Sequence, residues 1–81
     1  MNRQEILLKF QDIFRTNFND EELIITYETS AEDIEEWDSF EQINLLVAIE
    51  GEFKIKFELK EVSALKNVNG MVNLVESHLA E

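Results

Sequence analysis

The sequence predicts a small all-α domain, a four-helix bundle with three main helices, a short third helix and a long loop between the first two. The 81 residues include no proline and only two glycines, so few positions interrupt a helix. Apolar residues recur at helical spacing in separate segments of the chain. Because cysteine is absent, these apolar residues must hold the fold without disulfides. We expect one soluble domain over residues 1–81, since no signal peptide or membrane-length apolar run is present.

The first helix is expected over residues 3–17. Asn2 and Glu5 have the spacing of a capping box, in which each side chain bonds the backbone N–H of the other residue. Apolar residues follow at helical spacing, namely Ile6, Leu7, Phe10, Ile13, Phe14 and Phe18. A polar connection over residues 19–37 comes next and carries a short apolar cluster at Leu23, Ile24, Ile25 and Tyr27. A connection of this length is usually functional or contains a minor helical turn.

The second helix is expected to begin at Ser39. Ser39 and Gln42 have capping-box spacing, and the acidic Asp38 and Glu41 suit the positive end of a helix dipole. The following residues are apolar almost all round the helix: Phe40, Ile43, Leu45, Leu46, Val47, Ala48, Ile49 and Phe53. They cannot all face one core, so the helix should either be enclosed or present an apolar strip to another molecule.

The last third of the chain should contain a short helix and a longer one. Phe53, Ile55, Phe57 and Leu59 alternate with polar residues, but no second strand is available to pair with them. We therefore expect an extended loop that packs these side chains on the bundle, followed by a short helix over residues 59–65. Asn67 is expected to cap the final helix, whose buried face would comprise Val68, Met71, Val72, Val75 and Leu79.

The charge of the chain limits its partners. Its formal net charge is −11, which argues against nucleic acid and anionic membranes, because both require clustered lysine and arginine. No lysine or arginine lies between Arg15 and Lys54, and the acidic residues there allow two interpretations. They form either a solvated face that maintains solubility or a docking surface that steers basic partners. The self-repulsion predicts a monomer, and the lack of secretory features favours the cytoplasm.

Ser39 is the residue of greatest chemical interest. A serine nucleophile needs a base within hydrogen-bonding reach, and the only histidine, His78, has the position of an exposed residue near a helix C-terminus. A catalytic pair is therefore disfavoured, and we expect no enzyme. No metal site is expected either, because Asp33, Glu35 and Asp38 lack the central glycine and closing glutamate of a calcium loop. Ser39 either caps its helix or is a site of modification, where the helix N-terminus could accommodate a phosphate.

The sequence resembles the acyl carrier protein family over nearly its full length. The family motif Asp-Ser-Leu at the start of the second helix corresponds to Asp38-Ser39-Phe40. The apolar helix that follows ends in a Glu-x-x-Phe pattern, here Glu50-Gly51-Glu52-Phe53, and a helical segment begins near Leu65-Lys66-Asn67-Val68. The short motif is weak alone and becomes specific when it is combined with length, acidity and helix order.

The resemblance implies a discrete carrier protein with a bundle of acyl-carrier type. Ser39 would be the attachment point of 4'-phosphopantetheine, which a separate phosphopantetheinyl transferase transfers from coenzyme A, and Asp38 would belong to the motif that this transferase recognises. The arm's thiol would hold acyl groups as thioesters for loading, synthase and acyltransferase enzymes with basic docking patches. Residues that would contact these partners are Phe40, Glu41, Asn44, Val47 and Glu50, whereas Leu45, Ile49 and Phe53 would face the interior.

The chain departs from carriers of primary fatty acid synthesis at three positions. Those carriers usually have leucine at the position of Phe40 and glutamate at the positions of Asn44 and Gly51. We therefore favour a specialised carrier, for example of a polyketide, secondary-metabolite or surface-polysaccharide pathway. The alternatives are a D-alanyl or peptidyl carrier and an unmodified acidic adaptor. Whether an acyl chain enters the bundle would depend on a cavity opening between Leu46, Ile49, Phe53 and Val68.

Overall fold

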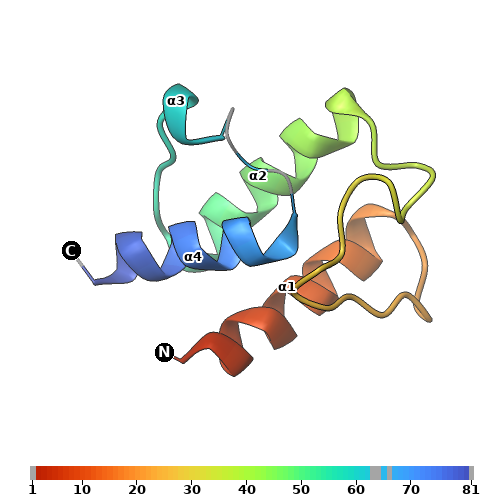
Figure 1. Cartoon of the computed structure of the whole chain (residues 1–81), viewed down its shortest axis with the longest axis horizontal. Coiled ribbons are helices and arrows are strands. Elements are labelled where there is room, and N and C mark those ends of the chain that lie inside the picture. Colours follow the sequence, from red (N-terminus) through yellow and green to blue (C-terminus); the bar gives the residue numbers. More distant parts are fainter. Residues whose placement is uncertain (1, 63–64, 66, 81) are drawn as a thin grey trace.

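The structure, a computed structural model, describes residues 2–62, 65 and 67–80. These residues form four helices, α1 (Arg3–Asn17), α2 (Ser39–Phe53), α3 (Leu59–Val62) and α4 (Val68–Leu79), as Figure 1 shows. Within the described part of the chain, β-pairing is limited to one isolated bridge between Ser30 and Asn67. The prediction of an all-α bundle with a long loop and a short third helix is confirmed. None of the helices in this part is long and apolar enough to cross a membrane.

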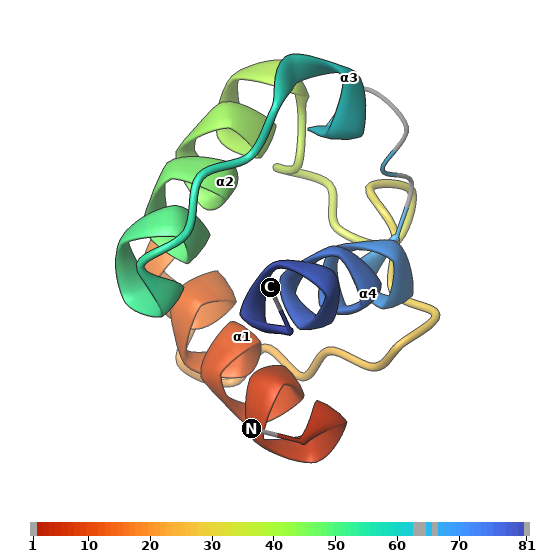
Figure 2. The same cartoon turned by 90° about the vertical axis from the view of Figure 1, so that its left-hand side faces the viewer.

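The core lies where α1 packs against both α2 and α4, an arrangement that can be followed in Figures 1 and 2. Aromatic rings join α1 to α2, because Phe10 meets Phe53 edge-on with ring centroids 5.8 Å apart. The predicted inward positions Leu45, Ile49 and Phe53 are buried, as expected. The remaining buried apolar residues are Ile6, Phe10, Phe14, Ile25, Ile34, Trp37, Val68, Met71, Val72 and Val75. Burial of this apolar set is the main source of stability in a chain without disulfides.

Two of the three predicted helix caps are confirmed. In α1, the backbone N–H of Glu5 donates to Oδ1 of Asn2 at 2.9 Å, and the Asn2 N–H donates to Oε1 of Glu5 at 3.3 Å. In α4, the Gly70 N–H donates to Oδ1 of Asn67 at 2.9 Å. These side chains satisfy backbone donors that have no partner within the helix, so both helices begin where the sequence predicts.

The segment after α2 differs from its prediction. Lys54 ends the helix in a left-handed conformation with φ 56° and ψ 47°, and Ile55 and Phe57 then pack on the core as expected. Leu59, however, is 83% exposed, and α3 ends at Val62. Residues 63 and 64, which the predicted short helix would include, lie outside the described residues. The prediction that Leu59 packs on the bundle was wrong, because residue alternation identifies one side of a segment but not whether another element covers it.

The long connection between α1 and α2 is held by hydrogen bonds on two sides. The Gln11 side chain accepts from the Ile25 N–H at 2.7 Å, which fixes the connection to α1. On the other side, the N–H groups of Val68 and Asn69 donate to the carbonyls of Thr29 and Tyr27, each at 2.8 Å, which fixes it to α4. Residues 19–38 contain turns but no helix. The connection is therefore an ordered part of the fold that leads the chain to the start of α2.

Candidate functional site

Ser39 is the first residue of α2, and its side chain is exposed. The helix is capped by Asp38, whose Oδ1 accepts from the Glu41 N–H at 2.9 Å. The predicted capping box of Ser39 and Gln42 was therefore wrong by one position. A carboxylate accepts hydrogen bonds strongly and complements the helix dipole, so Asp38 takes the capping position and Ser39 enters the helix. Among the described residues, no hydrogen bond engages the Ser39 hydroxyl, which leaves it available for chemistry.

Gln42 has a different role from the one predicted. Its Oε1 accepts from the indole Nε1 of Trp37 at 2.6 Å. Trp37 is buried, and its ring meets Phe14 edge-on at a centroid distance of 5.3 Å. Trp37 is thus anchored to α1 by packing and to α2 by a hydrogen bond. Sequence reasoning missed this contact, although a tryptophan next to a helix start was a visible signal.

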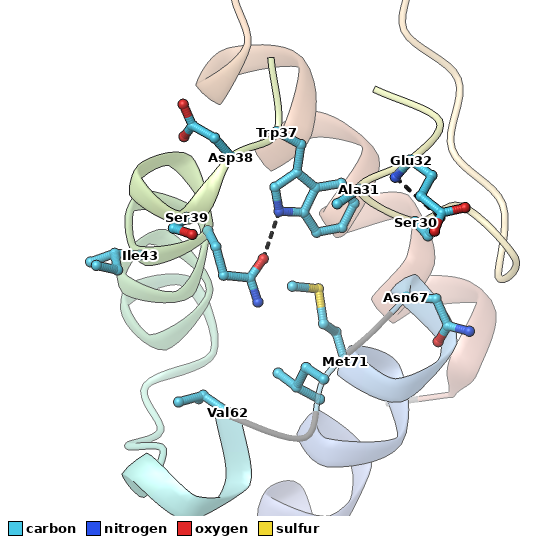
Figure 3. Close-up of a pocket in the computed structure, with 12 residues that line it drawn as sticks. Ser30, Ala31, Glu32, Trp37, Asp38, Ser39, Ile43, Val62, Asn67 and Met71 are labelled. Carbon is cyan, nitrogen blue, oxygen red and sulfur yellow. Dashed lines mark hydrogen bonds between the residues drawn. The ribbon is translucent and has the colours of Figure 1, made fainter. Parts of the chain in front are cut away.

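An open pocket of about 790 Å³ adjoins Ser39 (Figure 3). The long connection, α2, α3, α4 and the segment between the last two helices all contribute to its wall. The described lining residues are Ser30, Ala31, Glu32, Trp37, Asp38, Ser39, Gln42, Ile43, Val62, Leu65, Asn67 and Met71. Neither Leu46, Ile49, Phe53 nor Val68, between which the sequence analysis considered a cavity, is among them. The pocket lies beside the serine instead of within the core.

The outer face of α2 carries an exposed apolar strip formed by Phe40, Ile43 and Val47. Their exposed fractions are 72%, 61% and 61%, and their spacing of three and four residues places them on one side of the helix. Of the two outcomes expected for this helix, enclosure or an exposed apolar strip, the structure shows the exposed strip. Ile43 belongs to this strip although it was not among the predicted contact residues. The inner face of the same helix carries Leu45, Ile49 and Phe53, which are buried.

The polar residues predicted on α2 differ in their surroundings. Asn44 is exposed and donates from Nδ2 to Oε1 of Glu41 at 2.8 Å, so these two residues form one polar surface. The carboxylate of Glu50 is half-buried, and its Oε2 accepts from the Phe57 N–H at 2.7 Å. Glu50 therefore holds the chain that leaves α2, a structural role that the sequence analysis missed. In the described part of the chain, no group of histidine, cysteine and acidic residues could hold a metal ion.

His78 is not the exposed residue that the sequence predicted. Its side chain is only 14% exposed, and Nε2 lies 3.2 Å from each carboxylate oxygen of Glu61. The backbone N–H of Glu58 holds the pKa of Glu61 below its usual value, burial opposes this effect, and His78 lowers it further. The C-terminal end of α4 and the start of α2 lie at opposite ends of the molecule in Figure 1. The fold therefore does not bring His78 to Ser39.

The fold and the site together define a small helical domain that presents a serine hydroxyl, which no described residue engages, beside a pocket and next to an exposed apolar helix face. No protein-family model matches the chain. It is similar to an acyl carrier protein of Petrotoga mobilis, with 30% identity over 79 residues that cover 98% of this chain and 93% of that protein.

A solved structure supports the same relationship. The solution NMR structure of a holo acyl carrier protein from Geobacter metallireducens is 46% identical in sequence and has a TM-score of 0.85. The match covers 91% of this chain and 85% of that one. The chain belongs to the acyl carrier protein family.

Proposed function

We propose that the chain carries acyl groups as thioesters on a 4'-phosphopantetheine arm attached to Oγ of Ser39, and that it presents them to partner enzymes. The observation that carries this proposal is the exposed Ser39 hydroxyl at the edge of the pocket, which forms no hydrogen bond with any residue that the structure describes. A phosphopantetheinyl transferase would deliver the arm from coenzyme A and supply the base and the magnesium. When bound, the arm contributes the thiol that a cysteine-free chain lacks.

The surroundings of Ser39 fit such a group. The first turn of α2 presents backbone N–H groups and the positive end of the helix dipole, which favour a phosphate. Because Asp38 performs the capping, the Ser39 oxygen can form a phosphodiester without loss of the helix cap. The lining of the adjoining pocket includes the apolar side chains of Val62, Leu65 and Met71. Ser39 would hold the arm at the rim, with the pocket beside it.

Partners would dock on α2. Phe40, Ile43 and Val47 offer apolar contact, while Glu41 and the surrounding acidic residues offer charge to basic patches on the transferase and on acyl-loading, synthase and acyltransferase enzymes. Each exposed charge contributes about 1 kcal/mol or less. Their summed field matters more, since it accelerates encounter with basic partners and disfavours acidic ones. An unmodified adaptor that uses the same strip is the second candidate, because the strip is already exposed in the unmodified chain.

A mass measurement tests the proposal. The purified apo protein is incubated with coenzyme A, magnesium and a promiscuous phosphopantetheinyl transferase, and its intact mass is recorded. We expect the gain of one phosphopantetheine, loss of this gain in Ser39→Ala, and an unchanged gain in Ser77→Ala, which removes an exposed serine on α4. An unmodified wild-type chain, or labelling that persists in Ser39→Ala, would contradict the proposal and favour the adaptor.

A further inference from the structure

The hydrogen bond between Trp37 and Gln42 fixes the orientation of the Gln42 side-chain amide. An indole N–H can only donate, so the atom of Gln42 that lies 2.6 Å from Nε1 must be the amide oxygen. The amide nitrogen, with its two donor hydrogens, therefore faces away from Trp37. Trp37 is only 7% exposed and packs against Phe14 and Phe18, so the indole is itself held in place. Gln42 is thus a donor in a set orientation.

This donor lies in the pocket beside Ser39. Both residues line the pocket, and they are three positions apart on α2, so about 4.5 Å, slightly less than one helical turn, separates them along the axis. Within the residues that the structure describes, nothing accepts a hydrogen bond from Nε2 of Gln42. Partly buried donors are usually paired with protein, water or ligand, and a paired donor stabilises what it binds.

The other polar side chains of the pocket are largely engaged within the protein. Oγ of Ser30 accepts from the Glu32 N–H at 3.3 Å and lies 3.4 Å from Oδ2 of Asp33. Oδ1 of Asn67 accepts from the Gly70 N–H, which leaves its amide nitrogen as a second donor. Asn67, however, lies across the pocket from Ser39 in Figure 3. Gln42 is therefore the oriented donor nearest to the attachment point.

We propose that Gln42 is a positioning residue, whose side-chain amide donates a hydrogen bond to a carbonyl or hydroxyl oxygen of the group tethered to Ser39. The inference rests on the proposed function, because it requires that group. A phosphopantetheine arm carries a hydroxyl and two amide carbonyls, and an oxygenated acyl group would offer further oxygens. A plain alkyl chain offers none and would gain nothing from an oriented donor. The one-turn separation from Ser39 favours an oxygen of the arm over one at the far end of the cargo.

Nuclear magnetic resonance of the isotope-labelled protein tests this proposal. The side-chain amide of Gln42 and the indole N–H of Trp37, the only tryptophan in the chain, are followed in four states. These are the apo protein, the holo protein, and holo protein loaded with butyryl or 3-hydroxybutyryl groups. We expect the Gln42 amide resonances to shift in the holo state, while the indole resonance retains its hydrogen-bonded position.

Two matched variants, each of which removes one side-chain amide donor, distinguish the contribution of Gln42 from that of Asn67. Gln42→Glu retains an oxygen to accept from Trp37 and loses the donor, whereas Asn67→Asp retains the α4 cap and loses the donor across the pocket. Each variant adds one negative charge, so a difference between the two variants does not arise from net charge. Docking here means the equilibrium between the tethered group bound in the pocket and the same group free in solvent. We expect Gln42→Glu to lower this equilibrium constant about two- to tenfold, as for one lost hydrogen bond. We expect Asn67→Asp to leave it unchanged. If Gln42→Glu does not fold, Gln42→Met removes the donor at similar length and should produce the same loss.

The outcomes are distinguishable. Mass spectrometry first shows whether the arm is attached; a wild-type chain that never accepts it overturns both this inference and the proposed function. With the arm attached, a shift in the holo state assigns the acceptor to the arm, and a shift only with the 3-hydroxybutyryl group assigns it to the cargo. Gln42 resonances that stay at their apo positions in every loaded state overturn the role of Gln42 alone. So does docking that is lost in Asn67→Asp but not in Gln42→Glu.

Discussion

Nε2 of His78 lies 3.2 Å from both carboxylate oxygens of Glu61, so the imidazole joins α3 to the last turn of α4. The ring also meets Phe57 edge-on, with centroids 5.6 Å apart. None of the four residues of α3 is buried, so this short helix has little apolar packing of its own. Its position therefore depends on polar contacts at its ends, and Val62 of the same helix forms part of the pocket beside Ser39.

The Glu61 contact should make stability depend on pH in the acidic range. Folding lowers the pKa of Glu61 below 4.5, chiefly through the Glu58 N–H and additionally through His78. A lowered pKa means that the folded state favours the ionised carboxylate. Its stabilising effect is therefore complete above 4.5 and is lost as the pH falls through the lower folded pKa.

The measurement is thermal unfolding of wild type and Glu61→Gln across this range. We expect wild type to have the higher melting temperature near neutral pH and the difference to shrink as the solution is acidified. Glu21→Gln removes one charge from the exposed connection and controls for the general effect of net charge. A difference between wild type and Glu61→Gln that grows on acidification would show that the contact does not favour the ionised form.

The cap of α2 provides a second prediction. Because Asp38 and not Ser39 accepts from the Glu41 N–H, Asp38→Ala should lower the free energy of unfolding by about 1 kcal/mol. Ser39→Ala should change it by less than about 0.5 kcal/mol, as expected for an exposed position without a specific contact. Urea unfolding of the apo proteins checks both values. Equal losses in the two variants would mean that Ser39 shares the capping role.

The two faces of α2 should respond differently to truncation. Ile49 is fully buried, so Ile49→Ala should cost about 2–5 kcal/mol of unfolding free energy through lost burial and the cavity left behind. Phe40 is 72% exposed, so Phe40→Ala should change stability by about 0.5 kcal/mol or less. If partners dock on this strip, the Phe40 variant should also raise the KM of the transferase for this protein. Stability that falls substantially in Phe40→Ala would place Phe40 in the fold instead of the docking surface.

Gly51 should be replaceable with a gain in stability. It lies inside α2 without a positive φ, and a Cβ added there would meet nothing within 4 Å. Alanine has the higher helix propensity, so Gly51→Ala should raise the free energy of unfolding by about 0.5–1 kcal/mol. Urea unfolding measures the change, with the exposed Ala48→Gly as the converse variant, which should lose a similar amount. A loss of stability in Gly51→Ala would contradict the open surroundings of this position.

Features that depend on neighbouring residues in the chain could be predicted from the sequence. The bounds of α1, the caps of α1 and α4 and the inward positions of α2 follow from helical spacing and side-chain hydrogen bonds over three residues. The position of Ser39 at the start of an apolar helix followed in the same way. The cap of α2 did not follow in this way, because Asp38 and Ser39 are both good capping residues and the path of the chain into α2 selects Asp38.

Features that join distant parts of the chain were decided by the tertiary structure. Helical spacing identified a face of α4 but not what covers that face. Leu79 was expected to be buried and is 40% exposed. His78 was expected to be exposed and is covered by Glu61 and Phe57. The pocket also depends on the tertiary structure, since its wall combines residues that range from Ser30 to Met71 along the chain. Local chemistry thus determined where the helices lie and which serine begins α2. Only packing, which buries surfaces from segments remote in sequence, determined what surrounds that serine.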